Sequence, residues 1–339
     1  MDLSLSGEQR QLVESFAAMY ARESTSERVR AAEPLGFDAK LWAALVDTGA
    51  VEMAVAESDG GWGASELELA LIAEQYGRAV ASAPVIEAQV GARVLAAAGS
   101  GLLADAMAGD QVVTFAPRPS RGDALVLVPG GAVADAVVAL VGDRLVVASA
   151  GSRDQVANLG SLPLADITVD SAVDGGVTVL ADGPDAVRLF SGAVDLWLTL
   201  TAAAMVGAAA KALEIGVDYA KQRHAFGTPI GAFQAVSHPL ADSAAAVDGA
   251  RLLAFEAACA FADEPGRVTE LAAMAFAFAY ETARDATQRV LHIHGGYGFG
   301  MEGDIQLYYR RARGWAMAYG EPGVALDRAA DARYGAVSG

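Results

Sequence analysis

Four long apolar segments with helical spacing dominate the C-terminal half of the chain and limit what it can fold into. They cover residues 196–223, 234–262, 269–294 and 303–318 and are rich in alanine. Helices of this length pack against one another as a bundle. Because alanine, leucine, phenylalanine and methionine occupy several sides of each segment, the bundle has more apolar surface than its own core needs. The excess predicts packing against another subunit.

The rest of the chain shows two other patterns. Residues 6–98 carry apolar side chains at helical spacing, whereas residues 110–180 consist of short β-branched runs separated by turn residues. The second pattern predicts a small antiparallel domain of about five to seven strands. We therefore expect an α+β fold with an N-terminal helical domain at 1–109, a middle β domain at 110–183 and a C-terminal four-helix bundle at 184–339.

Charge and composition exclude several classes of protein. The chain has 42 acidic and 24 basic residues, and 53% of its side chains are hydrophobic. This balance argues against disorder and against a nucleic-acid partner, which would need clustered cations. The uncharged stretch 196–210 is shorter than the roughly 20 residues that span a bilayer, so it predicts a buried helix and no membrane insertion. The single cysteine, Cys259, and an N-terminus unlike a signal peptide favour the cytoplasm.

A basic cluster interrupts two apolar helices in the segment Tyr219–Gln234. One interpretation is local: Lys221 and Arg223 are favourable charges at a helix C-terminus, and Gly227 and Pro229 end the helix. The other interpretation places an anion such as a phosphate against Arg223, whose planar guanidinium can bind two oxygens at once. The pattern alone leaves both open.

A glycine cluster follows the third long apolar segment, at His292–Gly300. Four glycines fall within the six residues 295–300, more than one helix end requires. Glycines lack Cβ atoms, so they let a backbone approach a ligand closely. His292 and His294 are two residues apart and point in different directions on a helix, so we expect no metal site here.

Together these two segments resemble signatures of the acyl-CoA dehydrogenase family. The matching stretches are Arg223–Ile230 with Phe233 and Gln234, Leu240–Asp242, Ala250–Arg251, His294–Gly298 and Tyr309–Arg313, and, nearer the N-terminus, Leu41–Trp42, Thr48–Ala50, Gly60–Gly63 and Glu74–Arg78. The likeness spans nearly the whole chain. It also reproduces the order of helices, β domain and four-helix domain.

The resemblance implies FAD-dependent α,β-dehydrogenation of an acyl-CoA thioester. In this reaction a carboxylate takes the α-proton and the β-hydrogen leaves as hydride to the flavin. The carboxylate belongs in an apolar pocket, because desolvation raises its pKa and strengthens it as a base. Electrons then pass to an electron-transfer flavoprotein or a similar acceptor. An acyl-CoA oxidase or a flavin monooxygenase on the same fold remains an alternative.

The resemblance also assigns residues to the ADP half of FAD, which in the family reaches over from a neighbouring subunit. These residues are Arg223, Phe226, Gln234, His292, Gly295 and Gly296. His292 stands where many members carry glutamine, and it can still donate a hydrogen bond. Such a shared site requires at least a dimer.

The β domain departs from the family where the flavin ring would lie. Family members usually present a Thr-Glu-Pro stretch, then Gly-Ser-Asp, then a tryptophan strand. This chain has Thr114–Ser120 followed by Gly122 and Asp123, and no tryptophan between Trp62 and Trp197. We expect its flavin cradle to be degraded or rebuilt.

The catalytic base is the second departure. Counting forward from Arg310, the usual place of the glutamate falls on Tyr319, and Glu321 comes two positions late. Some relatives carry the base at the end of the helix that contains the Ala-Arg pair, which here points to Glu264. Glu264 also lies in an Asp-Glu-Pro-Gly stretch that is ordinary loop chemistry. We favour Glu264 over Glu321, and a third alternative is that this chain supplies no base.

A short chain with an altered flavin cradle resembles the smaller partners of heteromeric acyl-CoA dehydrogenases, some of which act on steroid side-chain CoA thioesters in actinobacteria. The compressed segment 170–195 suits this resemblance. It implies an alternative function, in which the chain is a non-catalytic partner that completes the FAD site of another subunit. Homomer and heteromer both remain open at this stage.

Overall fold

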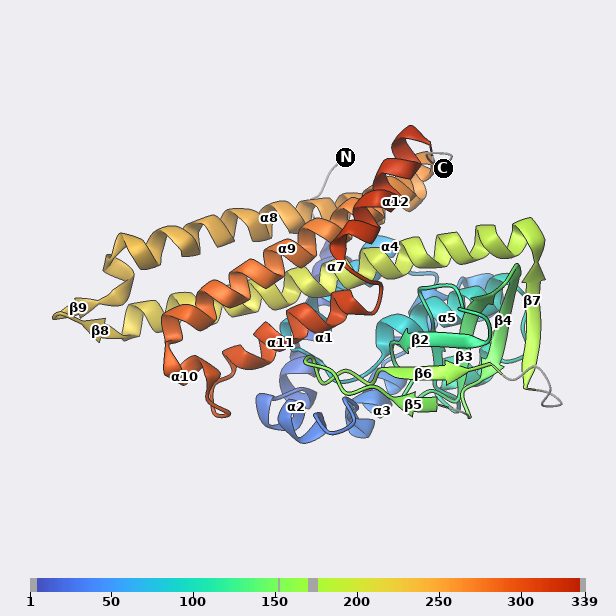
Figure 1. The fold of residues 1–339 in the computed structure, drawn as a ribbon, viewed down its shortest axis with the longest axis horizontal. Coiled ribbons are helices and arrows are strands. Elements are labelled where there is room, and N and C mark those ends of the chain that lie inside the picture. Colours follow the sequence, from blue (N-terminus) through green and yellow to red (C-terminus); the bar gives the residue numbers. More distant parts are fainter. Residues whose placement is uncertain (1–4, 152, 170–175, 336–339) are drawn as a thin grey trace. The chain divides into compact units, whose positions relative to one another are not determined.

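The computed structural model describes residues 5–151, 153–169 and 176–335 (Figure 1). Contacts divide the chain into two compact units. The bundle unit comprises Met1–Ser26, Ala70–Ala81 and Thr199–Gly339, and the sheet unit comprises Glu27–Leu69 and Ser82–Leu198. Each unit joins segments that are distant in sequence. The domain boundaries at 109 and 183 therefore stay a prediction about chain segments.

The bundle unit is built from long helices. Its elements are α1 (Gly7–Glu23), the Ala70–Arg78 part of α4 (Glu66–Arg78), the part of α7 (Gly183–Gln222) from Thr199 onward, the hairpin β8 (His224–Ala225) and β9 (Thr228–Pro229), η3 (Ile230–Ala232), α8 (Gln234–Asp263), η4 (Pro265–Arg267), α9 (Val268–His294), α10 (Gly296–Phe299), α11 (Ile305–Met317) and α12 (Pro322–Tyr334). Helix α9 packs against α8, α11 and α12 and forms the centre of the bundle. The four long apolar segments are confirmed as helices α7, α8, α9 and α11.

The sequence pattern missed helix α12. Pro322 stands in its first turn, and most of its side chains are exposed, with only Ala325 and Ala329 buried. Two buried alanines leave too weak a periodicity to predict a helix. Its place is set by packing on α9, where Arg333 pairs with Glu270.

Helix α7 is long and apolar enough to cross a membrane by length and composition. However, 83% of its most apolar window is buried inside the protein. A membrane span would instead expose its apolar side chains to lipid. This burial supports the prediction that 196–210 is a core helix.

Two glycines let α4 and α7 cross closely within the bundle unit. A Cβ atom at Gly77 of α4 would lie 1.8 Å from the Ala204 carbonyl oxygen of α7. Reciprocally, a Cβ atom at Gly207 of α7 would lie 2.0 Å from the Glu74 carbonyl oxygen of α4. The two backbones are therefore in direct contact. Side chains at either position would force the helices apart.

The sheet unit holds helices and two small sheets. Its elements include α2 (Ser26–Ala32), α3 (Ala39–Asp47), η1 (Glu52–Ala54), η2 (Glu57–Asp59), α5 (Val85–Ala97), α6 (Leu103–Ala108), β1 (Val113–Phe115), β2 (Ala124–Val128), β3 (Ala136–Val141), β4 (Arg144–Ser149), β5 (Arg153–Gln155), β6 (Ala165–Thr168) and β7 (Val177–Asp182). One sheet has the order β1-β3-β4-β7 and the other the order β2-β6-β5. Both contribute to one core that includes Leu125, Val137 and Ile167.

The sheet pairing differs from the expected pattern in one place. Strands β1 and β3 run parallel, with Thr114 opposite Val137, whereas the other pairs in the two sheets are antiparallel. The intervening strand β2 belongs to the other sheet, so β1 and β3 are not joined by a hairpin. The α+β architecture and the number of strands agree with the sequence prediction.

A desolvated carboxyl group in the sheet unit gives a pH-dependent prediction. Burial raises the pKa of the Glu87 side chain on α5, although the Trp197 indole donates a hydrogen bond to it at 3.1 Å. A carboxyl with a raised folded-state pKa binds its proton more tightly in the folded chain, so stability falls as pH rises through that range.

We therefore expect Glu87→Gln to be more stable than the parent at neutral pH, because glutamine needs no deprotonation and can still accept the indole hydrogen bond. The advantage should shrink as pH falls toward the ordinary glutamate range. Urea unfolding at a series of pH values measures it. A stability difference that stays constant across the series would contradict the prediction.

Candidate functional site

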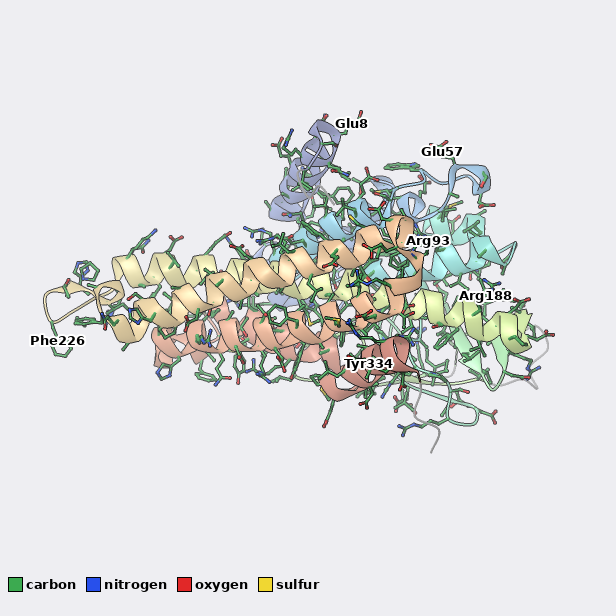
Figure 2. The ribbon with its side chains drawn as sticks, turned by 90° about the horizontal axis from the view of Figure 1, so that it is seen from above. Glu8, Glu57, Arg93, Arg188, Phe226 and Tyr334 are labelled. Atoms are coloured by element: carbon green, nitrogen blue, oxygen red, sulfur yellow. The ribbon has the colours of Figure 1, made fainter. Side chains whose placement is uncertain are left out.

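The β8–β9 hairpin at the end of the bundle unit carries an aromatic side chain, Phe226, that the described residues leave exposed (Figure 2). Ala225 pairs with Thr228, so Phe226 and Gly227 form a two-residue turn with φ values of 52° and 80°. A left-handed conformation is costly for phenylalanine. The Phe226 side chain is nevertheless 97% exposed, with only an edge contact to Phe233. Neither backbone preference nor burial accounts for this residue, which points to contact with another molecule.

Arg223 lies at the base of the same hairpin. Its backbone closes the hairpin, because its carbonyl accepts from the Ile230 amide at 2.8 Å. Its guanidinium is exposed, and no carboxylate among the described residues pairs with it. In a chain with an excess of acids, an arginine without a carboxylate partner is available to an anion. This arrangement favours the anion interpretation of the basic cluster over the local one.

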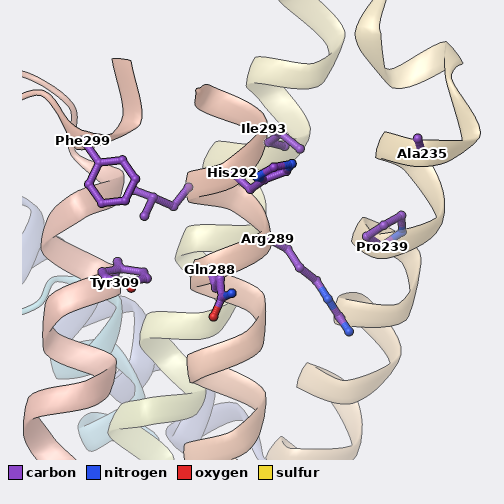
Figure 3. A pocket seen from close by; sticks show the side chains of 9 residues that line it. Ala235, Pro239, Gln288, Arg289, His292, Ile293, Phe299 and Tyr309 are labelled. Carbon is purple, nitrogen blue, oxygen red and sulfur yellow. The ribbon is translucent and has the colours of Figure 1, made fainter. Parts of the chain in front are cut away.

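A cavity of about 420 Å³ opens on the bundle unit close to the predicted ADP residues (Figure 3). Its lining residues are Ala235, Pro239, Gln288, Arg289, Leu291, His292, Ile293, Phe299 and Tyr309. Arg289 and His292 point from α9 toward Ala235 and Pro239 of α8, whereas Gln288 lies on the side of Phe299 and Tyr309. Gln234 directly precedes Ala235 in the chain. Two of the predicted residues therefore lie in or beside the cavity.

The glycine cluster ends helix α9 and begins the short helix α10. Gly295 has φ 62° and ψ −143°, and a Cβ atom at Gly295 or Gly296 would meet nothing within 4 Å. This backbone is open to an incoming ligand. His292 lines the cavity, but His294 is buried, stacks on Tyr219 at 4.0 Å and contacts the Val290 carbonyl through Nδ1. The two histidines thus point to different sides, as their spacing predicts.

The segments that form this end of the bundle unit have an unusual charge pattern. Residues 220–240 and 286–301 contain none of the 42 carboxylates of the chain and all four of its histidines. They also contain Lys221, Arg223 and Arg289. The side chains of these two stretches therefore favour an anion, whereas the exposed Glu302 and Asp304 follow directly after the second stretch.

The first part of the stretch that would cradle the flavin ring, Thr114–Pro117, is buried, whereas Arg118–Asp123 are partly or fully exposed. Thr114 is completely buried, and its hydroxyl donates to the Pro129 carbonyl. Phe115 is also completely buried and packs against Phe190. Ala116 is 3% exposed. These residues form the core of the sheet unit rather than a polar surface for an isoalloxazine ring.

The two candidate bases lie in solvent-exposed surroundings. Glu264 caps the end of α8, keeps a 42% exposed side chain and pairs with Arg267 at 2.8 Å. Glu321 precedes α12 and is exposed. Tyr319, at the usual place of the base, is buried and packs edge-on against Phe276 at 5.7 Å. Neither glutamate has, among the residues that the structure describes, the apolar pocket that its role requires.

Other family-like motifs serve the structure. Glu74 of the Glu74–Arg78 motif is buried and pairs with Arg251 of the Ala-Arg motif at 3.1 Å. Arg311 is buried and donates to the Ala81 carbonyl, while Tyr308 donates to the Arg78 carbonyl. The motifs meet inside the bundle unit and join its helices. Their presence is explained by packing and does not require a ligand.

Sequence reasoning missed the residues that complete the cavity, namely Gln288, Arg289, Phe299 and Tyr309. Arg289 precedes His292 by three positions, so the two share a helix face. That spacing was the available indication. Tyr309 belongs to the basic stretch Tyr309–Arg313 of the family resemblance. In the structure the guanidinium carbon of Arg313 lies 3.7 Å from the centroid of the Tyr309 ring, and the same guanidinium donates a hydrogen bond to the Gln288 side chain.

Two family models match the chain, "Acyl-CoA dehydrogenase, N-terminal domain" over residues 6–103 and "Acyl-CoA dehydrogenase, C-terminal domain" over residues 198–333. The chain belongs to the acyl-CoA dehydrogenase family. Its similarity to a curated member, acyl-CoA dehydrogenase IpdE2 of Mycolicibacterium smegmatis, is 31% identity over 96% of this chain and 98% of that protein. FAD is the cofactor of this acyl-CoA dehydrogenase, and acyl-CoA is its substrate.

Solved structures of acyl-CoA dehydrogenases show the same fold. The ChsE4-ChsE5 complex from Mycobacterium tuberculosis has a chain that is 26% identical, with a TM-score of 0.86 and 97% coverage of both chains. The Tcur3481-Tcur3483 steroid acyl-CoA dehydrogenase is also 26% identical, with a TM-score of 0.85 and coverage of 96% and 97%. Each of these two structures is named for a pair of different proteins.

Proposed function

We propose that this acyl-CoA dehydrogenase chain holds the ADP half of FAD within a heteromeric enzyme, and that an unlike subunit supplies the flavin-ring cradle and the catalytic base. One contrast carries this proposal. The residues expected at the ADP half are exposed and face open space, whereas Thr114 and its neighbours at the expected flavin cradle are buried. A chain that offers half of a cofactor site needs a second chain to complete it.

The residues present fit an ADP group. Arg223 offers an exposed guanidinium to a phosphate. Gln234 and His292 offer hydrogen-bonding groups, and the backbone at Gly295 and Gly296 permits close approach. Phe226 offers an exposed ring for apolar contact. When bound, FAD accepts the β-hydrogen of the acyl group as hydride. In this proposal the chain binds and orients the ADP half of the cofactor, and this helps to fix the position of the flavin ring.

The solvent exposure of Glu264 and Glu321, the two candidate bases, supports the unlike partner. A base that removes a weakly acidic C–H proton needs an apolar pocket. Glu264 is tied to Arg267 in solvent, and the buried Tyr319 replaces the usual carboxylate. The names of the ChsE4-ChsE5 complex and the Tcur3481-Tcur3483 enzyme, each of two different chains, support the same assembly here.

The base assignment is tested in the assembled enzyme, made by co-expression with a second, unlike acyl-CoA dehydrogenase chain from the same organism. We expect Glu264→Gln and Glu321→Gln each to retain kcat within about twofold, because the replacement of a solvent-exposed carboxylate has little effect on the rest of the protein. Glu281→Gln, another exposed carboxylate, is the matched control. A loss of about a hundredfold or more in either variant, with the control unchanged, would assign the base to this chain.

The assembly itself is tested by purifying the chain alone and with its partner. The proposal expects flavin absorbance and acyl-CoA oxidation only from the mixed assembly. A flavin-loaded, active homomer would overturn it.

We also propose a bulky acyl-CoA substrate such as a steroid side-chain thioester, on the support of the steroid enzyme named above. We further propose a cytoplasmic location and an electron-transfer flavoprotein or similar electron acceptor. Comparing kcat/KM for short-chain and steroid thioesters, with oxygen and with the flavoprotein as acceptor, tests the substrate and acceptor.

A further inference from the structure

We infer that Arg289 is a further cofactor-positioning residue, which binds a phosphate oxygen of the ADP half of FAD inside the cavity between α8 and α9. The inference rests on the proposed function, because it assigns a residue to the same half-site. Arg289 is not among the residues that the family resemblance indicates. It is identified here by its place in the cavity wall, one helical turn before His292.

The charge of Arg289 is incompletely satisfied within the chain. It is half-buried, and among the described residues its one hydrogen-bond partner is the Ser243 hydroxyl, at 3.0 Å from Nη1. Arginines elsewhere in the chain are paired differently: Arg251 contacts Glu74 and Asp248, and Arg284 contacts Asp285. A guanidinium has five N–H donors, so four of those of Arg289 remain for a ligand. A half-buried cation without a carboxylate in a cavity favours an anionic ligand.

The single contact that Arg289 does make fixes its direction. The Ser243 hydroxyl accepts from Arg289 and donates to the Pro239 carbonyl at 2.8 Å. This chain of two hydrogen bonds runs from α9 to α8 across the cavity wall. It holds the guanidinium in place before a ligand arrives, which lowers the entropy lost on binding.

Pro239 adds an acceptor to the same wall. Because proline has no N–H, the Ala235 carbonyl lacks the donor that residue i+4 provides in a regular helix. Ala235 and Pro239 both line the cavity. A cation on α9 and, on α8, a carbonyl that lacks its usual helical donor suit a ligand with both anionic oxygens and an amino group. An adenine nucleotide has both, and the cavity volume is within the range of small-molecule sites.

The test uses the assembled enzyme stripped of flavin, with FAD and ADP binding measured by titration. We expect Arg289→Gln to weaken both ligands by about tenfold or more, because a charged hydrogen bond is lost. Binding of riboflavin, which has no phosphate, should be unchanged. Arg289→Lys should recover part of the loss, because a lysine keeps the charge without the planar fork. Arg284→Gln is the control, because Arg284 is a partly exposed arginine of the same helix that pairs with Asp285, and its affinity should stay within about twofold.

Ser243→Ala provides a second variant that keeps the charge and removes only its anchor. We expect a smaller loss of ADP affinity, about threefold, since the guanidinium would still reach the ligand after losing one orienting hydrogen bond. The flavin-free assembly should keep its melting temperature in both variants. This variant keeps the test decisive if Arg289→Gln folds poorly.

Unchanged ADP affinity in Arg289→Gln, or an equal loss in Arg284→Gln, would overturn the inference. So would a variant that dissociates the subunits without flavin, because the anion would then be a carboxylate of the partner. Failure of this inference is distinguishable from failure of the proposed function. If Arg223→Gln loses ADP and Arg289→Gln does not, only the role of Arg289 is wrong. If neither loses ADP, the half-site itself is wrong.

Discussion

Arg223→Gln is expected to lose most of its affinity for FAD in the assembled enzyme. The guanidinium has no carboxylate partner among the described residues and lies at the base of an exposed hairpin. Its removal therefore deprives the ligand of a cationic partner and leaves no described carboxylate of the protein without one. Loss of a bidentate arginine–phosphate contact weakens binding by about 2–4 kcal/mol, or roughly 30- to 1,000-fold. Flavin titration of the stripped assembly measures the change.

The matched control for this experiment is Arg188→Gln. Arg188 is an exposed arginine near the other end of α7, where it pairs with Asp185 at 3.2 Å. The Arg188→Gln substitution makes the same change in net charge as Arg223→Gln and should alter FAD affinity by less than about twofold. Equal affinity in Arg223→Gln and the parent enzyme would mean that the basic cluster only terminates helix α7, which is the local interpretation of the same residues.

Gly77→Ala is expected to destabilise the folded chain by about 3 kcal/mol or more, because the added methyl would overlap the Ala204 carbonyl oxygen at the α4–α7 crossing. Helix propensity alone predicts the opposite sign, a gain of about 1 kcal/mol for alanine over glycine. The steric effect should win, since a contact of 1.8 Å requires one backbone to move. Urea unfolding measures the change.

Two further variants control this experiment. Gly207→Ala should destabilise in the same way, because its added methyl would lie 2.0 Å from the Glu74 carbonyl oxygen. Gly192 is an exposed position within α7 where a Cβ atom meets nothing within 4 Å, so Gly192→Ala should be neutral or stabilising. A Gly77→Ala chain as stable as Gly192→Ala would show that the two helices can separate without loss.

Local patterns predicted most of the fold. Spacing of apolar residues identified α7, α8 and α9 because each buries a continuous stripe along its length. It did not identify α12, which buries only two small side chains, or the parallel pairing of β1 with β3. Pairing between distant strands depends on how the whole unit packs, and no short stretch of sequence contains that information.

The candidate site was predictable where motifs carry it and unpredictable where burial decides it. Arg223 and Gln234 were identified from a recognisable signature. Arg289 stands in no such signature, and its significance depends on α8, which brings Ser243 and Pro239 to the same cavity region. Sequence likewise cannot tell whether Glu264 is desolvated, because that depends on which chains surround it.

The uneven placement of carboxylates has a consequence for how quickly the cofactor is captured. A dinucleotide that diffuses toward a chain of net charge −18 is repelled over most of the surface, but the stretches 220–240 and 286–301 present no negative side chain. The dinucleotide therefore approaches the end of the helices formed by these two stretches more readily than the more acidic parts of the surface. Long-range repulsion of this kind guides encounter before any hydrogen bond forms, and mobile ions at physiological ionic strength attenuate it over roughly 8 Å.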